Sequence, residues 1–407
     1  MQIKNKIAIL ISWPRELDMF QVLIENISDD LVIVIDDLIY TESERSGNVK
    51  NIVELMDREL EYILLSKVLR KLKYNILFST AQTFQERFTF RSYLKYYYAV
   101  SIGSFLQFFG LSNLFLKIIN RPLTGGGKNA KKFEIHQIER EIGIKVIRYP
   151  KGLDVSFKRY PVDRWKQEFD MHLCHSDIDY NLIKNKFPLA DCIKIGYPKY
   201  DSIILPEEAK QEIYSEFVNL DKSKPIIVWM PAHIKNRSER GLNLELWLPV
   251  INRLTKKYNV IVRPHPKTRM VSHYHIDSLI ESNLIVDLNF NREMGILYQA
   301  ADLILADYGG SVLDSIYMKK RTVLLNMSHK SNFYKWRKQG EYLDQYVRND
   351  IVSIDYNDAV DLSEVVDEVL CDEGALTPSK LKNKYFEKSE NYKNIIDILN
   401  NIKSEMF

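Results

Sequence analysis

Cysteine is scarce in this sequence: there are 3 among 407 residues, and no two of them are spaced as CxxC. So few thiols cannot form a disulfide framework, and we therefore expect a protein of the reducing cytoplasm. We also expect no signal peptide. The apolar run near the N-terminus covers only residues 7–11, and charge resumes at Arg15.

Neither sign of charge dominates the sequence. It has 57 Lys and Arg against 54 Asp and Glu, a net charge of +3. A nucleic-acid partner bound through net charge is therefore not expected. The acidic residues at 29–30 and 36–37 stand as isolated pairs, and we expect a reaction that needs no bound metal. Apolar residues at 45% and charged residues at 27% exclude a mainly disordered chain.

One long segment carries no charge. Residues 96–116 are uncharged and lie between Lys95 and Lys117, and this length could span a bilayer. However, the segment contains tyrosine, serine, glutamine and asparagine, and its apolar residues recur at helical spacing. Three interpretations follow: a buried or half-buried helix, an interfacial helix that docks on a membrane, or a true span.

Short apolar runs alternate with helical patterns along most of the chain. Each run is continuous rather than alternating, which is typical of parallel strands covered on both faces. We expect strands at residues 5–11, 31–36, 75–80, 146–150, 171–176, 192–198, 225–233, 259–266, 284–288, 303–311 and 322–326, and helices at 58–72, 244–258 and 312–320. Two such series predict two doubly wound α/β domains that meet near residues 195–215, with ligands at the carboxyl ends of the strands.

One candidate anion site lies within the apolar run at 303–311. Asp307 ends the strand, Gly309 and Gly310 form a turn that permits positive φ, and a helix opens at Ser311. The free N–H groups of a helix N-terminus favour phosphate or pyrophosphate. A glycine turn with a serine N-cap and no ligand is the alternative.

A second strand end is basic. The sequence Arg263-Pro264-His265-Pro266-Lys267 leaves a buried strand, and its two prolines fix the exit geometry. Histidine can act as acid, base or phosphate ligand, while arginine and lysine neutralise phosphate charge.

Two weaker motifs complete the set. Pro231-Ala232-His233 ends another strand and begins a polar, basic loop, which either closes over a nucleotide or is solvated surface. Gly196-Tyr197-Pro198 and Asp201 lie just before the expected second domain and by spacing alone form a turn.

In this order and spacing the four motifs resemble the second half of the CDP-glycerol glycerophosphotransferase family, which includes teichoic-acid polymerases and primases. The resemblance covers about residues 190–330. The counterparts are Gly196-Tyr197-Pro198-Lys199-Tyr200-Asp201, Pro231-Ala232-His233, Arg263-Pro264-His265-Pro266 and Ala306-Asp307-Tyr308-Gly309-Gly310-Ser311.

This resemblance implies an α/β protein of the GT-B fold, with two Rossmann-like, doubly wound domains facing a central cleft. We expect an acceptor-binding domain over residues 1–195 and a donor-binding domain over 196–375. A C-terminal helix over 376–407 would pack back on the first domain. The donor would be a cytidine nucleotide, and the protein would work at the inner face of the cell membrane.

The sequence departs from the family pattern in its N-terminal half. The family has an H-G-T motif there whose histidine is thought to be the base, and the nearest counterpart here is a Gly-rich stretch, residues 123–128, without histidine. His136 is a possible substitute, although a solvent-facing helical position is the simpler interpretation. The loss weakens the case for glycerol phosphate more than the case for a cytidine nucleotide, because β-Kdo transferases that use CMP-Kdo have a similar arrangement.

We therefore expect a metal-independent transferase of surface-polysaccharide synthesis (teichoic-acid-like, capsule or O-antigen) that requires no cofactor. It would move glycerol phosphate or a related polyol phosphate from a CDP-activated donor to a glycan or lipid-linked acceptor, with an anionic membrane surface as a further partner. The alternatives are a CMP-sugar glycosyltransferase and a non-catalytic binding protein of the same fold. The expected catalytic residues are His265, His136 and Lys128; the donor-binding residues are Arg263, Lys267, Pro231, His233, Asp307, Gly309, Gly310, Ser311 and Tyr197; the acceptor-binding residues are Thr124, Gly125 and Gly126.

Overall fold

The computed structural model divides the chain into two compact units, which are described separately. The first unit comprises Met1–Lys151, Arg159–Lys199 and Glu390–Phe407, and the second comprises Gly152–Lys158 and Tyr200–Ser389. The structure describes residues 2–11, 16–27, 30–36, 60–69, 71–80, 137–150, 152–153, 169–201, 205–232, 242–265, 268, 273–289, 292–327, 341–356, 361–371, 377–386 and 395–406.

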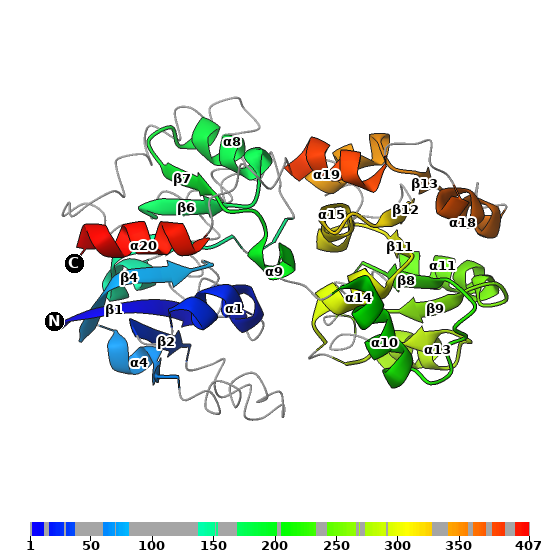
Figure 1. Ribbon diagram of the computed structural model, residues 1–407, viewed down its shortest axis with the longest axis horizontal. Helices are drawn as coiled ribbons and strands as arrows, with labels where there is room; N and C mark the ends of the chain where they lie inside the picture. Colours follow the sequence, from blue (N-terminus) through cyan, green and yellow to red (C-terminus); the bar gives the residue numbers. More distant parts are fainter. Residues whose placement is uncertain are drawn as a thin grey trace. The chain divides into compact units, whose positions relative to one another are not determined.

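The first unit contains a sheet of seven parallel strands in the order β3-β2-β1-β4-β5-β6-β7 (Figure 1). The strands are β1 (Gln2–Ile11), β2 (Leu31–Ile35), β3 (Tyr62–Leu64), β4 (Leu72–Ser79), β5 (Gly143–Arg148), β6 (Met171–Cys174) and β7 (Asp191–Lys194). All five residues of β2 are buried, as expected for a parallel strand with both faces covered.

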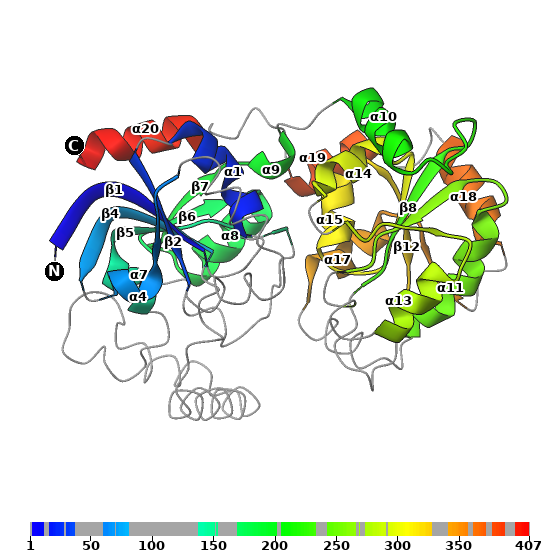
Figure 2. The same cartoon turned by 90° about the horizontal axis from the view of Figure 1, so that it is seen from below.

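Helices cover both faces of this sheet (Figure 2). On one face α1 (Glu16–Asn26) and α20 (Ile395–Met406) pack with Ile7, Ile9 and Ile11 of β1. On the other, α4 (Leu65–Val68) and α7 (Gln137–Ile142) pack with Ala8 and Leu10. Because successive side chains of β1 point to opposite faces of the sheet, this strand contributes side chains to both cores. A further helix, α8 (Asp177–Lys186), connects β6 to β7.

The second unit contains six parallel strands in the order β10-β9-β8-β11-β12-β13. They are β8 (Ile226–Met230), β9 (Asn259–Val262), β10 (Ile285–Val286), β11 (Leu303–Ala306), β12 (Arg321–Leu325) and β13 (Ser353–Ile354). One face packs on α11 (Leu242–Leu254), α13 (His273–Ile280) and α18 (Leu362–Cys371) around Trp229 and Trp247. The other described helices of this unit are α10 (Pro206–Glu216), α14 (Met294–Ala300), α15 (Gly310–Tyr317), α17 (Leu343–Tyr346) and α19 (Pro378–Phe386), with the 3₁₀ turn η4 (Val347–Asn349). The short helix α9 (Pro198–Asp201) contains the boundary between the two units.

Both sheets reverse their strand order at one point, as in Rossmann folds. The reversal lies between β1 and β4 in the first unit and between β8 and β11 in the second. Ligands of such sheets bind outside the carboxyl ends of the strands at this point. In the second unit those ends are followed by residues 231–232 and 307–309, which belong to two of the predicted motifs.

The expected helix over residues 58–72 is wrong. Tyr62–Leu64 instead form β3, which pairs in parallel with residues 33–35 of β2, and only α4 is helical before β4 begins at Leu72. Hydrogen bonding to a distant strand overrides the local helical pattern here. At the other end of the chain, 376–407 contains two helices rather than one: Phe386 of α19 packs on Tyr317 of the second unit, whereas α20 joins the first core.

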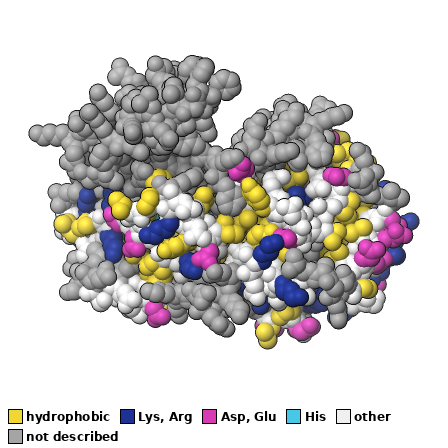
Figure 3. Space-filling model, turned by 90° about the horizontal axis from the view of Figure 1, so that it is seen from above, with side chains coloured by type: hydrophobic (Ala, Val, Ile, Leu, Met, Phe, Trp, Pro, Cys, Tyr) yellow, Lys and Arg dark blue, Asp and Glu magenta, His cyan; other side chains and the backbone are white. Residues whose placement is uncertain are grey.

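Basic and acidic side chains are interspersed on the face drawn in Figure 3, in agreement with the near-neutral net charge. Within the described part of the chain, no helix combines the length and apolarity needed to cross a membrane. The uncharged segment at 96–116 lies outside the described residues, and its three interpretations stay open.

Candidate active site

The glycine turn, defined as Gly309, Gly310 and Ser311, lies between the carboxyl end of β11 and α15. Positive φ occurs at Gly309, at +95°, and not at Gly310, so only the first glycine is required by its backbone conformation. A Cβ atom added at either glycine would meet nothing within 4 Å. The amides of Gly310 and Ser311 begin α15 and therefore have no acceptor within the helix. The turn thus offers open space and N–H donors to an anion.

Asp307 is fully buried beside this turn. Its Oδ2 accepts a hydrogen bond of 3.0 Å from the backbone N–H of Ala232, which joins the exits of β8 and β11. Burial raises the pKa of Asp307 to about 6, although Asn243, the Ala232 amide and Arg348 lower it. The carboxyl group therefore holds the two strand ends together, and its expected contact with the donor stays a prediction.

Two charged residues that were not among the expected site residues contact the glycine turn or the two residues before it. Asp344 of α17 is fully buried, and its Oδ2 accepts a 2.6 Å hydrogen bond from the N–H of Gly309. Arg348 of η4 donates to the carbonyl oxygen of Asp307, and its guanidinium lies 3.8 Å from the ring centre of Tyr308. The sequence signal for this pair is the D-x-x-x-R spacing of Asp344 and Arg348, because residues four apart lie on the same face of a helix.

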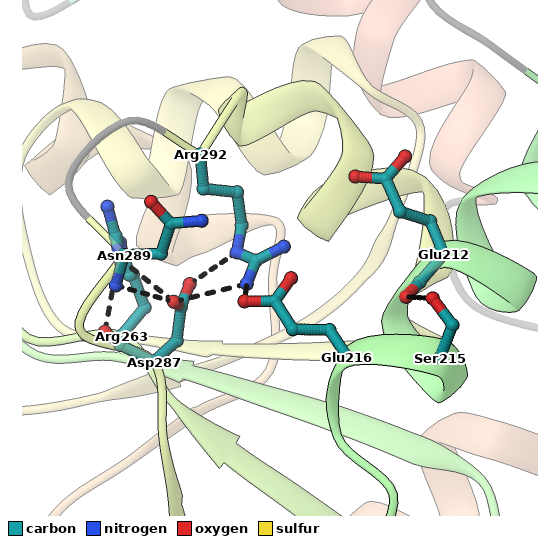
Figure 4. Close-up of polar contacts among 7 residues, drawn as sticks. All are labelled: Glu212, Ser215, Glu216, Arg263, Asp287, Asn289 and Arg292. Carbon is teal, nitrogen blue, oxygen red and sulfur yellow. Dashed lines mark hydrogen bonds and ion pairs between the residues drawn. The ribbon is translucent and has the colours of Figure 1, made fainter. Parts of the chain in front are cut away.

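Arg263, which directly follows β9, is buried within an ion-pair network (Figure 4). Its Nη1 donates to the carbonyl oxygen of Asp287 at 3.1 Å and lies 3.2 Å from Asp287 Oδ1. Arg292 Nε lies 2.8 Å from Asp287 Oδ2, and Arg292 Nη2 lies 2.5 Å from Glu216 Oε1. The Arg263 guanidinium therefore balances internal charge in this structure, and its expected donor contact stays a prediction.

His265, two residues later, is exposed. Its backbone carbonyl accepts a 2.8 Å hydrogen bond from the N–H of Thr268, and Pro264 precedes it. The strand exit thus separates the two basic residues: Arg263 anchors it inside the unit, and His265 reaches the surface. An exposed imidazole at a strand end can contact a ligand phosphate or exchange a proton with it.

Tyr197, an expected donor-binding residue, lies in the first unit and is buried against His175, with 4.3 Å between ring centres. The sequence analysis did not select His175. Its Nδ1 donates to the carbonyl oxygen of Gly196 at 2.7 Å, and burial lowers its pKa to about 4. The imidazole is therefore neutral at pH 7 and supports the Gly196-Tyr197 turn, where Gly196 has a φ of +71°.

The expectation of no bound metal was based on isolated acidic pairs, but the sequence also contains a D-x-D spacing, Asp177-Ile178-Asp179. Asp179 accepts hydrogen bonds from the N–H groups of His175 and Ser176 at the start of α8, and Asp177 pairs with Lys194 at 2.6 Å. These carboxylates cap a helix and neutralise a lysine. Among the described residues, no group of three or more His, Cys, Asp or Glu side chains could hold a metal ion.

Seven predicted site residues lie outside the described residues: Thr124, Gly125, Gly126, Lys128, His136, His233 and Lys267. Their roles stay predictions. The structure does bring Pro231 and Ala232 to the edge of the sheet that also carries Asp307 and the glycine turn.

The two Rossmann-like units define the GT-B class of fold. Two solved structures of similar fold support this assignment. A structure titled "Structure of the Wall Teichoic Acid Polymerase TagF" is similar over 100% of this chain and 91% of its own, with a TM-score of 0.57 and 12% identity. The UDP-GlcNAc 2-epimerase from Methanocaldococcus jannaschii is similar over 98% of this chain and 100% of its own, with a TM-score of 0.53 and 13% identity. These likenesses establish the fold.

The family is established by the sequence itself. Residues 140–358, more than half of the chain, match the family described as CDP-glycerol:poly(glycerophosphate) glycerophosphotransferase, and the chain belongs to that family. A comparison with curated proteins finds no significant match. The protein is therefore a transferase of the class that uses CDP-glycerol as donor. The expected fold class, family and enzyme class are confirmed.

Proposed function

We propose that the second unit binds the donor with its phosphates at the glycine turn, and that His265 assists the departure of the cytidine nucleotide. The open space beside Gly309 and Gly310, at the point where the strand order reverses, carries this proposal. The amides of Gly310 and Ser311 would neutralise phosphate charge, and His265 would contact the phosphate or supply a proton. Positioning and charge neutralisation by protein groups support such a transfer without a bound metal.

The remaining expected residues complete the proposal. Pro231 and His233 would contact the donor, and Lys267 would add charge near His265. Lys128 or His136 would replace the missing histidine of the H-G-T motif, and the segment 124–126 would contact a glycan or lipid-linked acceptor. The family match favours a CDP-activated polyol phosphate over a CMP-sugar donor.

Replacing Gly310 by Val tests the phosphate site. A Cβ added at Gly310 would meet no protein atom within 4 Å, and the φ angle of Gly310 is not positive, so the variant should fold. The valine side chain would nevertheless fill the space that the phosphate needs. We expect the Kd for CDP to rise at least about tenfold, or about 1.4 kcal/mol, by isothermal titration calorimetry. Gly152→Val is the matched control, because a Cβ there also meets nothing within 4 Å. Unchanged CDP affinity in folded Gly310→Val would refute the site.

We propose further that the acceptor is lipid-linked and that the enzyme works peripherally at the inner, anionic face of the membrane, with residues 96–116 as the contact. The apolar and aromatic side chains there, between Lys95 and Lys117, suit an anionic headgroup region. Wild type should sediment with anionic vesicles, and a Phe108→Ser, Phe109→Ser variant should not, with a nearly unchanged melting temperature. If the segment is core, each lost phenylalanine should cost about 3–5 kcal/mol of stability instead, and wild type should not sediment.

A further inference from the structure

The backbone of the glycine turn is held from one neighbouring segment, residues 342–350. Arg348 contacts both residues that precede the glycine turn, at the carbonyl oxygen of Asp307 and at the ring of Tyr308. It also donates to Oδ1 of Asn326, which follows β12. Asp344 accepts the N–H of the next residue, Gly309. Three consecutive residues, 307 to 309, are therefore fixed by two side chains.

Both side chains come from one helical stretch, because α17 continues directly into η4. Asp344 and Arg348 are four residues apart, a spacing that places them on the same face of a helix. That face is turned towards residues 307–309, as the contacts above show. The segment is tied at its far end by Asp350, whose carboxylate lies 2.6 Å from Lys384 of α19 and also accepts the hydroxyl of Tyr385.

Charge alone does not account for a carboxylate at this position. The N-terminus of α15 attracts anions, and a buried carboxylate beside it opposes a second anion such as phosphate. The positive guanidinium of Arg348 offsets that repulsion. The effect of Asp344 is instead on backbone conformation. Gly309 lacks a Cβ, and without a fixed partner for its N–H it would sample many backbone conformations.

We propose that Asp344 and Arg348 are positioning residues that hold the glycine turn in the conformation that receives the donor phosphates. This inference rests on the proposed function of the turn. Asp344 fixes the direction of the Gly309 N–H and thereby directs the amides of Gly310 and Ser311 outward. Arg348 holds the preceding two residues and compensates the charge of Asp344.

Two substitutions at one position separate geometry from charge. Asp344→Ala removes the acceptor, and we expect the Kd for CDP and the KM for CDP-glycerol to rise at least about tenfold, with a smaller change in kcat. Asp344→Asn keeps an oxygen that can accept the Gly309 N–H, and both constants should stay within about threefold of wild type. If both variants bind CDP as tightly as wild type, or if Asp344→Asn is as impaired as Asp344→Ala, the inference is overturned.

Asp350→Ala is the matched control, because it loosens the same segment at α19 without removing a contact to the turn. It should leave CDP affinity unchanged even where its melting temperature falls as far as that of Asp344→Ala; equal loss of affinity would overturn the inference. If Asp344→Ala does not fold, Arg348→Gln takes its place, with the same expected loss of CDP affinity.

Hydrogen exchange measured without any ligand distinguishes this inference from the proposed function. Peptides covering residues 303–314 should exchange faster in Asp344→Ala than in wild type and Asp350→Ala. Failure of wild type to bind CDP would refute the proposed function and the positioning role with it, whereas unaltered exchange in Asp344→Ala would refute the positioning role alone.

Discussion

His265→Ala is expected to lower kcat for transfer from CDP-glycerol by about 10²–10³-fold while changing the Kd for CDP much less. The imidazole is exposed at the carboxyl end of β9, and the buried Arg263 anchors the backbone two residues before it. Truncation should therefore leave the fold intact and remove only the group that neutralises charge developing on the departing nucleotide. Release of CMP under saturating donor, with EDTA present, measures the effect and also the proposed independence from metal.

Tyr274→Ala provides a control for surface truncation in the same unit, because Tyr274 is 68% exposed and outside the proposed site. It should retain wild-type kcat. Near wild-type turnover in folded His265→Ala would reduce that residue to a structural one. Loss of wild-type turnover in EDTA would instead show that a metal takes part.

Asp287→Ala is expected to lower the free energy of unfolding by about 3–5 kcal/mol, because it leaves two buried guanidinium groups without their shared carboxylate. The side chains of Arg263 and Arg292 are only 6% and 1% exposed, so water cannot replace the lost partner. Urea unfolding followed by tryptophan fluorescence measures the change, since Trp229 and Trp247 lie in the core of this unit.

Glu216→Ala is the matched control within the same network. Its carboxylate pairs with Arg292 but is 38% exposed, and Arg292 keeps Asp287 after the substitution. We expect a loss of only about 1 kcal/mol or less. Equal losses for the two variants would show that Asp287 is not the centre of the network drawn in Figure 4.

Continuous apolar runs predicted most strands of both sheets, because a parallel strand buried on both faces needs apolar residues at every position. The run at 31–36 contains β2, and the run at 303–311 begins with β11. Short strands were less predictable: β3 and β13 depend on pairing with β2 and β12. Neither was predicted, although the two-residue β10 lies within the apolar run predicted at 284–288.

The sequence by itself determined the class of the protein, through four strand-end motifs whose order and spacing survive in the chain. It also located the glycine turn, because a Gly-Gly pair between a buried strand and a helix is a local pattern. Only the tertiary structure decided the partners of these motif residues. The charge of Arg263 is paired with that of Asp287, and the N–H of Gly309 donates to Asp344. These partners lie 24 and 35 residues along the chain, and burial, rather than spacing, makes each contact strong.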